Sequence, residues 1–179
     1  MIDFHNHIIP NLDDGSKSIE MSLNMLKEAQ SQGITDVVNT VHFQHPKMDT
    51  KNTDYDFVIS EIKKMEEIAK NNNININIHP ASEVFFKFNL TEILDNPITT
   101  FGDGKYMLIE FDRLFFPRGY EDELFKLQLK NITPIIAHPE RYRLVQKDFT
   151  IAEKWIKRGY IIQLDCASIT GAFGKKTQK

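Results

Sequence analysis

The stretch that decides the fold is Tyr106-Met107-Leu108-Ile109-Glu110-Phe111, an apolar run that carries one carboxylate near its end. A short, nearly continuous apolar run is typical of a strand buried on both faces, as in parallel sheets that helices cover. A carboxylate in such a strand is costly to bury without a positive partner. The stretch therefore predicts a buried strand with a cation-binding or ion-paired group at its C-terminal end.

Five further apolar runs of strand length lie on either side of this stretch. They are Met1–Phe4, Asp36–Val41, Ile74–Ile78, Ile132–Ala137 and Tyr160–Leu164. Helix-like segments with apolar residues at helical spacing separate most of them: Ser18–Gln32, Asp54–Lys70, Tyr120–Lys130 and Phe149–Arg158. This alternation predicts an α/β protein with a mainly parallel sheet, in a single domain over residues 1–179.

The composition is that of a soluble globular protein and excludes several functional classes. The chain is 41% hydrophobic and 26% charged, with a net charge of −3. It has no basic excess, so no nucleic-acid partner is expected. Its one cysteine, Cys166, excludes an internal disulfide. Because no apolar window approaches ~18 residues and nothing resembles a signal peptide, we expect a cytoplasmic protein without membrane insertion.

Metal-ligand residue types recur at or near the C-terminal ends of the first five strand-like runs. These candidates are His5, His7, His42, Glu83, Glu110 and His138. Because such strand ends meet on one face of a βα barrel, where active sites lie, we expect them to share a site. The alternative is a set of unrelated polar strand ends, which would have to recur at five strands.

The sequence Asp13-Asp14-Gly15 lies a few residues beyond the first histidine pair. By itself Asp-Asp-Gly is a common turn. Its proximity to His5 and His7 makes one of the two aspartates, Asp13 or Asp14, a further candidate ligand.

The donor set predicts the chemistry. Imidazole mixed with carboxylate, without thiolate, favours Mn, Fe, Zn or Co over calcium or a thiolate site. Seven candidate ligands exceed the need of one ion, so two or three divalent ions are expected. Closely spaced ions generate hydroxide and hold both the attacking and the leaving oxygen of a phosphoryl group. Phosphoester hydrolysis is therefore the predicted reaction.

Arg141 lies three residues after His138 and suits a phosphate, because its guanidinium is planar and always charged. A salt bridge on a solvated loop is the alternative interpretation. A cysteine phosphatase is excluded, since alanine and not arginine lies six positions after Cys166. His45 and His79 are expected in loops and not as ligands.

Sequence blocks around these residues resemble the polymerase-and-histidinol-phosphatase (PHP) superfamily. The similarity is greatest to its branch of manganese-dependent bacterial protein-tyrosine phosphatases from capsule and exopolysaccharide operons. The matching blocks are Ile2–Ile8, Leu12–Gly15, Val41–Phe43, Ala81–Glu83, Leu108–Phe111 and Ala137–Tyr142. They extend over nearly all of the chain, and His-Pro-Glu-Arg-Tyr at 138–142 is the most specific. The resemblance implies a distorted TIM-like (β/α) barrel with a trinuclear centre, for which Mn is the expected metal.

The resemblance also implies a role for each candidate. His5, His7 and Glu83 would hold one metal, Glu83, Glu110 and His138 a second, Asp14 and His42 a third, and Arg141 would orient the phosphate. The implied reaction is attack of metal-bound hydroxide on the phosphorus of phosphotyrosine. The implied substrate is a phosphotyrosine-containing protein, a bacterial tyrosine autokinase that governs capsular polysaccharide synthesis. An oligomer is compatible with the sequence.

The family supplies a further Asp-x-His pair from a late strand, and no Asp-x-His follows His138 in this sequence. We therefore expect a C-terminally truncated, open barrel without these two ligands. Three functions stay open. They are a tyrosine phosphatase, a PHP-type phosphatase of small phosphomonoesters similar to histidinol phosphatase, and a degenerate module without catalysis.

Overall fold

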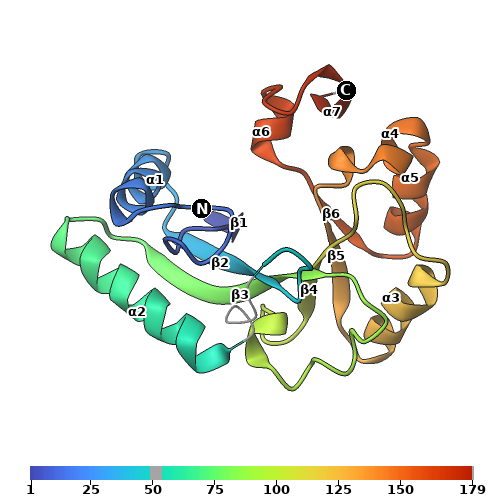
Figure 1. Cartoon of the computed structure of the whole chain (residues 1–179), viewed down its shortest axis with the longest axis horizontal. Coiled ribbons are helices and arrows are strands. Elements are labelled where there is room, and N and C mark those ends of the chain that lie inside the picture. The colour runs from blue at the N-terminus through green and yellow to red at the C-terminus, as the bar shows by residue number, and fades with distance from the viewer. Residues whose placement is uncertain (49–53, 179) are drawn as a thin grey trace. The chain divides into compact units, whose positions relative to one another are not determined.

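The computed structural model describes residues 1–48 and 54–178 and divides into two compact units. The first unit comprises Met1–Glu83 and Asn96–Phe101, and the second comprises Val84–Asp95 and Gly102–Lys179. Figure 1 shows the chain from blue at the N-terminus to red at the C-terminus. The single domain over 1–179 that the sequence predicts stays a prediction.

The first unit alternates strands with helices. Its elements are β1 (Ile2–Asn6), α1 (Ile19–Ser31), β2 (Asp36–Phe43), α2 (Tyr55–Asn71), β3 (Asn77–Phe85, whose last two residues belong to the second unit) and the 3-10 helix η2 (Pro97–Thr99). The strand order is β1-β2-β3. β1 and β2 are parallel, with Ile2 opposite Asp36, and their register shifts between Asp3 and Asn6.

Both long helices of this unit begin at a side-chain cap. The Ser18 hydroxyl accepts a hydrogen bond from the Met21 N–H at 3.1 Å and starts α1. The Asp54 carboxylate accepts one from the Phe57 N–H at 2.9 Å and starts α2. Such caps satisfy amides that have no partner within the helix. One face of α2 is buried at i, i+4, i+7 and i+11 spacing, as an amphipathic helix on a sheet requires: Val58, Ile62, Met65 and Ala69.

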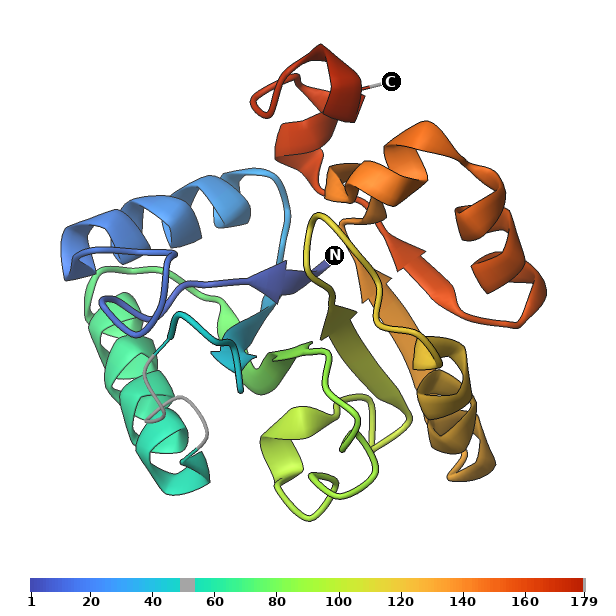
Figure 2. The same ribbon diagram turned by 45° about the vertical axis from the view of Figure 1, so that its right-hand side comes forward.

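The second unit repeats the alternation with more short helices. Its elements are β4 (Tyr106–Glu110), α3 (Tyr120–Leu129), β5 (Thr133–Ala137), η3 (Pro139–Arg141), α4 (Arg143–Lys147), α5 (Thr150–Lys157), β6 (Ile161–Gln163), α6 (Cys166–Ile169) and α7 (Lys175–Gln178). β4 pairs with β5 and β5 with β6, both in parallel (Figure 2). Met107, Leu108 and Ile109 of β4 are fully buried, as the opening stretch predicts for a strand covered on both faces.

An aromatic cluster forms the core of the second unit. The rings of Phe111 and Trp155 stack at 6.3 Å between centroids, and Phe116 packs edge-on against both. The Trp155 indole N–H donates to the Tyr120 hydroxyl at 3.1 Å, and the Phe111 N–H donates to the Tyr142 hydroxyl at 2.9 Å. The second bond connects the end of β4 to the segment that follows η3. The aromatic core therefore fixes the loops at two strand ends.

The structure confirms the α/β class, the parallel pairing and the four predicted helices, with one strand displaced. The strand expected at Ile74–Ile78 is β3, at Asn77–Phe85. The Ile74 N–H bonds to the Ala69 carbonyl and closes the end of α2, so strand pairing starts only at Asn77. Glu83 consequently lies within the strand. His79 also lies in β3, and its prediction as a loop residue was wrong.

In residues 1–48 and 54–178, none of the helices combines the length and the apolar character that a membrane span requires.

Candidate metal centre

Three imidazoles in the first unit converge on one buried carboxylate. Glu83 lies in β3 with a side chain that is 1% exposed. Its Oε2 atom lies 3.2 Å from His5 Nε2, 3.2 Å from His7 Nε2 and 3.5 Å from His42 Nδ1. His5 is on β1, His7 follows that strand, and His42 is on β2. Neighbouring parallel strands thus bring together four of the residues that the sequence predicts to share a site.

The Asp13-Asp14 loop adds two carboxylates with different roles. Asp14 Oδ1 lies 3.2 Å from His42 Nε2, and one ligand atom each of His7, Asp14 and His42 falls within 4.8 Å of the others. The hydrogen bond from His42 lowers the pKa of Asp14 to about 2. The Asp13 side chain is instead buried, with its Oδ2 atom 2.8 Å from His7 Nδ1. Asp14 therefore offers an exposed ligand, whereas Asp13 holds an imidazole.

The role of Asp13 could not be distinguished from that of Asp14 by sequence alone. Its Oδ1 atom accepts the Gly15 N–H at 3.1 Å, which fixes the carboxylate. A carboxylate on one ring nitrogen of a metal-binding histidine sets the tautomer and turns the other nitrogen to the metal. Here that other nitrogen, His7 Nε2, faces Glu83. Which aspartate turns inward depends on the loop backbone, and Asp-Asp-Gly does not encode it.

The electrostatics of the cluster suit a divalent cation. Burial disfavours the charged form of His7, but hydrogen bonds and charges from Asp13 and Glu83 outweigh burial and raise its pKa to about 10. A metal binds unprotonated imidazole and carboxylate, so metal binding to these groups would release the protons that they hold without it. The set of imidazoles and carboxylates, with no thiolate, fits Mn, Fe, Zn or Co.

Gly15 is required because the loop returns onto the backbone of His7. The Ser16 N–H donates to the His7 carbonyl at 3.1 Å, and the Asn11 N–H donates to the Ser16 carbonyl at 2.8 Å. A Cβ atom on Gly15 would lie 2.3 Å from both the Cβ and the carbonyl oxygen of His7. The backbone after His7 is fixed as well, since the Ile8 N–H donates to the buried Asn39 side chain at 2.9 Å.

We expect Gly15→Ala to displace His7 and weaken metal binding about tenfold or more, with a stability loss of ~1–3 kcal/mol from the steric overlap. Titration of the chelated protein with Mn²⁺ measures the first effect, and urea unfolding the second. Ser18→Ala is the matched control. It removes the cap of α1 and lowers stability by ~1 kcal/mol, but the Ser18 hydroxyl bonds to Met21 and not to His7. Equal metal affinity in the two variants would contradict the role of Gly15.

In the second unit, Glu110 ends β4 and His138 follows β5. His138 Nε2 lies 3.9 Å from Glu110 Oε1, and both side chains are buried. His138 has a left-handed backbone with φ 31° directly before Pro139, and its N–H donates to Gln163 Oε1 at 3.0 Å. Left-handed non-glycine residues cost ~1–3 kcal/mol and cluster at functional sites. Sequence spacing indicated this pair but not its backbone geometry.

Arg141 ends η3 and pairs through Nη2 with Asp165 Oδ2. This contact matches the salt-bridge interpretation, but the Arg141 side chain is only 16% exposed and does not lie on a solvated loop. The ring of Phe173 lies 4.0 Å from its guanidinium carbon. The guanidinium is therefore held on one face and at one nitrogen.

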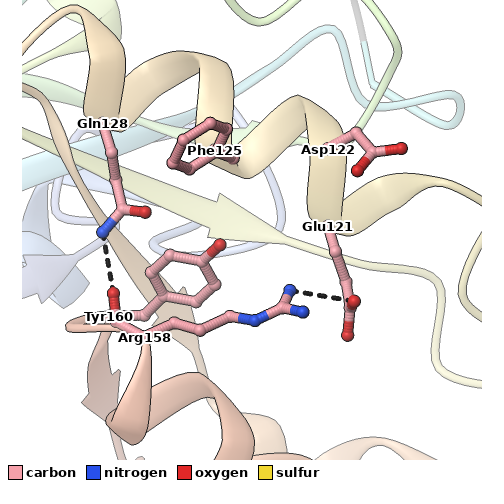
Figure 3. A pocket seen from close by; sticks show the side chains of 6 residues that line it. All are labelled: Glu121, Asp122, Phe125, Gln128, Arg158 and Tyr160. Atoms are coloured by element: carbon pink, nitrogen blue, oxygen red, sulfur yellow. Dashed lines mark hydrogen bonds and ion pairs between the residues drawn. The ribbon is translucent and has the colours of Figure 1, made fainter.

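A separate pocket in the second unit is not built from the predicted site residues (Figure 3). It is lined by Glu121, Asp122, Phe125, Gln128, Arg158 and Tyr160. Arg158 Nη1 lies 2.8 Å from Glu121 Oε2, and the Gln128 amide donates to the Arg158 carbonyl at 2.8 Å. Glu121 balances the charge of the Arg158 guanidinium. The ion pair and the Gln128 hydrogen bond together join α3 to the turn before β6.

The model of the family "Capsular polysaccharide synthesis, CpsB/CapC" matches residues 1–179. The chain belongs to the CpsB/CapC family. Over 180 residues it is 33% identical to the putative tyrosine-protein phosphatase CapC of Staphylococcus aureus. This alignment covers 100% of the present chain and 69% of CapC. It is 30% identical to the tyrosine-protein phosphatases YwqE of Bacillus subtilis and CpsB of Streptococcus pneumoniae, over 98% of this chain and 68% and 72% of theirs.

The fold of this CpsB/CapC member agrees with solved structures. It matches a chain from the crystal structures of YwqE and CpsB, described as metal-dependent tyrosine phosphatases, with a TM-score of 0.91 and 29% identity. The match covers 99% of this chain and 71% of the other. The resemblance stated from the sequence blocks is thereby confirmed.

Proposed function

We propose that this chain is a metal-dependent protein-tyrosine phosphatase. The observation that carries the proposal is the convergence of His5, His7 and His42 on the buried Glu83 carboxylate. Support comes from the similarity to YwqE and CpsB, which are named for this activity.

The proposed metal ligands are His5, His7, Asp14, His42 and Glu83 of the first unit, with Glu110 and His138 of the second. We propose two or three divalent ions, with Mn as the expected metal. When bound, such ions polarise the phosphoryl group and activate water. Glu83 offers its carboxylate to several imidazole neighbours, and Asp13 fixes the His7 ring.

Arg141 is proposed to bind the phosphate oxygens, because a guanidinium matches their geometry and keeps its charge at any working pH. Tyrosine suits the reaction as leaving group, since a phenol of pKa ~10 departs more readily than an alkoxide. A tyrosine autokinase as substrate and a cytoplasmic location stay predictions from the sequence.

Chelated protein is the starting point for the test. Adding Mn²⁺ is expected to raise hydrolysis of p-nitrophenyl phosphate and of a phosphotyrosine peptide at least ~10²-fold, with much less effect on a phosphoserine peptide. Turnover that does not depend on metal would refute the proposal. Preference for histidinol phosphate over the phosphotyrosine peptide would favour the small-molecule alternative. Less than one equivalent of metal by elemental analysis would favour the degenerate module.

A further inference from the structure

We infer that Asp165 is a positioning residue that holds the Arg141 guanidinium for a phosphate dianion. The inference rests on the proposed function and assigns a task to a residue that follows β6. Asp165 contacts Glu140 and Arg141 of η3, and Phe173, which lies beyond α6, packs on the same Arg141 guanidinium.

The first observation is the ion pair. Asp165 Oδ2 contacts Arg141 Nη2, and both side chains are largely shielded, with 25% and 16% exposed. A partly buried carboxylate–guanidinium pair is stronger and better oriented than a surface pair. The Asp165 carboxylate contacts one nitrogen of the Arg141 guanidinium, which has five N–H donors in a fixed planar geometry. It therefore orients the whole guanidinium while using only part of its donor capacity.

The second observation is that Asp165 is itself fixed. Its Oδ1 atom accepts the Ala167 N–H at 2.8 Å, and its own N–H donates to Glu140 Oε1 at 3.2 Å. The buried Ser168 hydroxyl donates to the same Glu140 oxygen at 2.6 Å. The segment after β6 therefore holds Glu140 through hydrogen bonds and Arg141 through charge, and the two are adjacent in the chain.

The third observation is the aromatic face. The Phe173 ring lies 4.0 Å from the Arg141 guanidinium carbon, in a cation–π contact. Stacking on the plane and pairing at Nη2 together restrict rotation about the last side-chain bonds of Arg141. A pre-oriented guanidinium loses less entropy when it binds an anion, which favours affinity and alignment.

The test compares Asp165→Asn, Asp165→Glu and Ser168→Ala in the Mn-loaded full chain. Asp165→Asn keeps the oxygen that caps Ala167 and removes the charge that faces Arg141. We expect it to raise both the KM for p-nitrophenyl phosphate and the inhibition constant of inorganic phosphate about tenfold, with a smaller change in kcat and unchanged metal content. Asp165→Glu is expected to recover part of the loss. Ser168→Ala loosens the same segment at Glu140 and is expected to leave both constants within about twofold.

A second readout does not require turnover. The chain has five arginines, so the guanidinium Nη–H resonances of Arg141, which include the hydrogens that face Asp165, can be assigned by difference from Arg141→Lys. A slowly exchanging Arg141 signal in the wild type that is lost in Asp165→Asn is expected. A wild-type chain without any turnover refutes the proposed function, whereas this signal and the binding of inorganic phosphate still test the contact. An active wild type with equal constants in Asp165→Asn overturns the inference, and so does tighter phosphate binding, which would make Asp165 a competitor of the substrate.

Discussion

Glu83→Gln is expected to abolish phosphatase activity, with kcat/KM lowered by at least ~10³-fold, or ~4 kcal/mol of transition-state stabilisation. The reason is geometric: one carboxylate oxygen lies within 3.5 Å of a nitrogen of each of His5, His7 and His42. An amide has the same shape but carries no negative charge. The metal content should fall by at least one equivalent, as measured by elemental analysis of the purified protein.

Asp36→Asn is the matched control for Glu83→Gln. Asp36 also pairs with a histidine, His79 at 2.9 Å, but on the surface and apart from the cluster. The same change from carboxylate to amide there should leave metal content and kcat/KM unaltered. Full activity in Glu83→Gln would show that the cluster is structural.

The metal-free protein is expected to lose stability as the pH rises from about 6.5 to about 10. His7 has a pKa of about 10 in the folded chain and 6.5 as its unperturbed value. Between these values the folded state holds a proton that the unfolded state has released. The contribution is therefore complete below pH 6.5 and is lost as the pH rises through about 10, with a slope of up to ~1.4 kcal/mol per pH unit.

Urea unfolding of chelated protein at several pH values measures this slope. Asp13→Asn should flatten it, because the Asp13 carboxylate is one of the groups that raise the pKa of His7. With Mn²⁺ the direction reverses, since a metal requires unprotonated imidazole and binds more tightly at higher pH. A metal-free protein that becomes more stable between pH 6.5 and 9 would contradict the protonated state of His7.

The sequence was sufficient for much of the fold because helix signals were local. The caps at Ser18 and Asp54 and the buried spacing of α2 are encoded within one or two turns. The strand at Ile74–Ile78 was predicted too early in the sequence. The alternating isoleucines indicate which side chains are buried, and they are buried. The start of the strand depends instead on backbone pairing, which begins where the Asn77 N–H donates to the Thr35 carbonyl.

The candidate site divides in the same way. His5, His7, His42 and Glu83 could be predicted, because strand ends carry them and parallel strands align their ends. The partners that hold His7, His138 and Arg141 could not be predicted. Asp13, Gln163 and Asp165 contact site residues across 6, 25 and 24 positions of sequence, and only the folded backbone brings them there.

The block at 138–142 has a consequence for how this protein can change. Its residues face four separate neighbours: His138 bonds to Gln163, Glu140 to Ser168, Arg141 to Asp165, and Tyr142 to Phe111. Lengthening this turn by a single residue would misalign all four at once, although a loop is usually the most tolerant part of a fold. Graftings and insertions are better directed to other loops, and divergence here has to proceed by paired replacement of a residue and its neighbour.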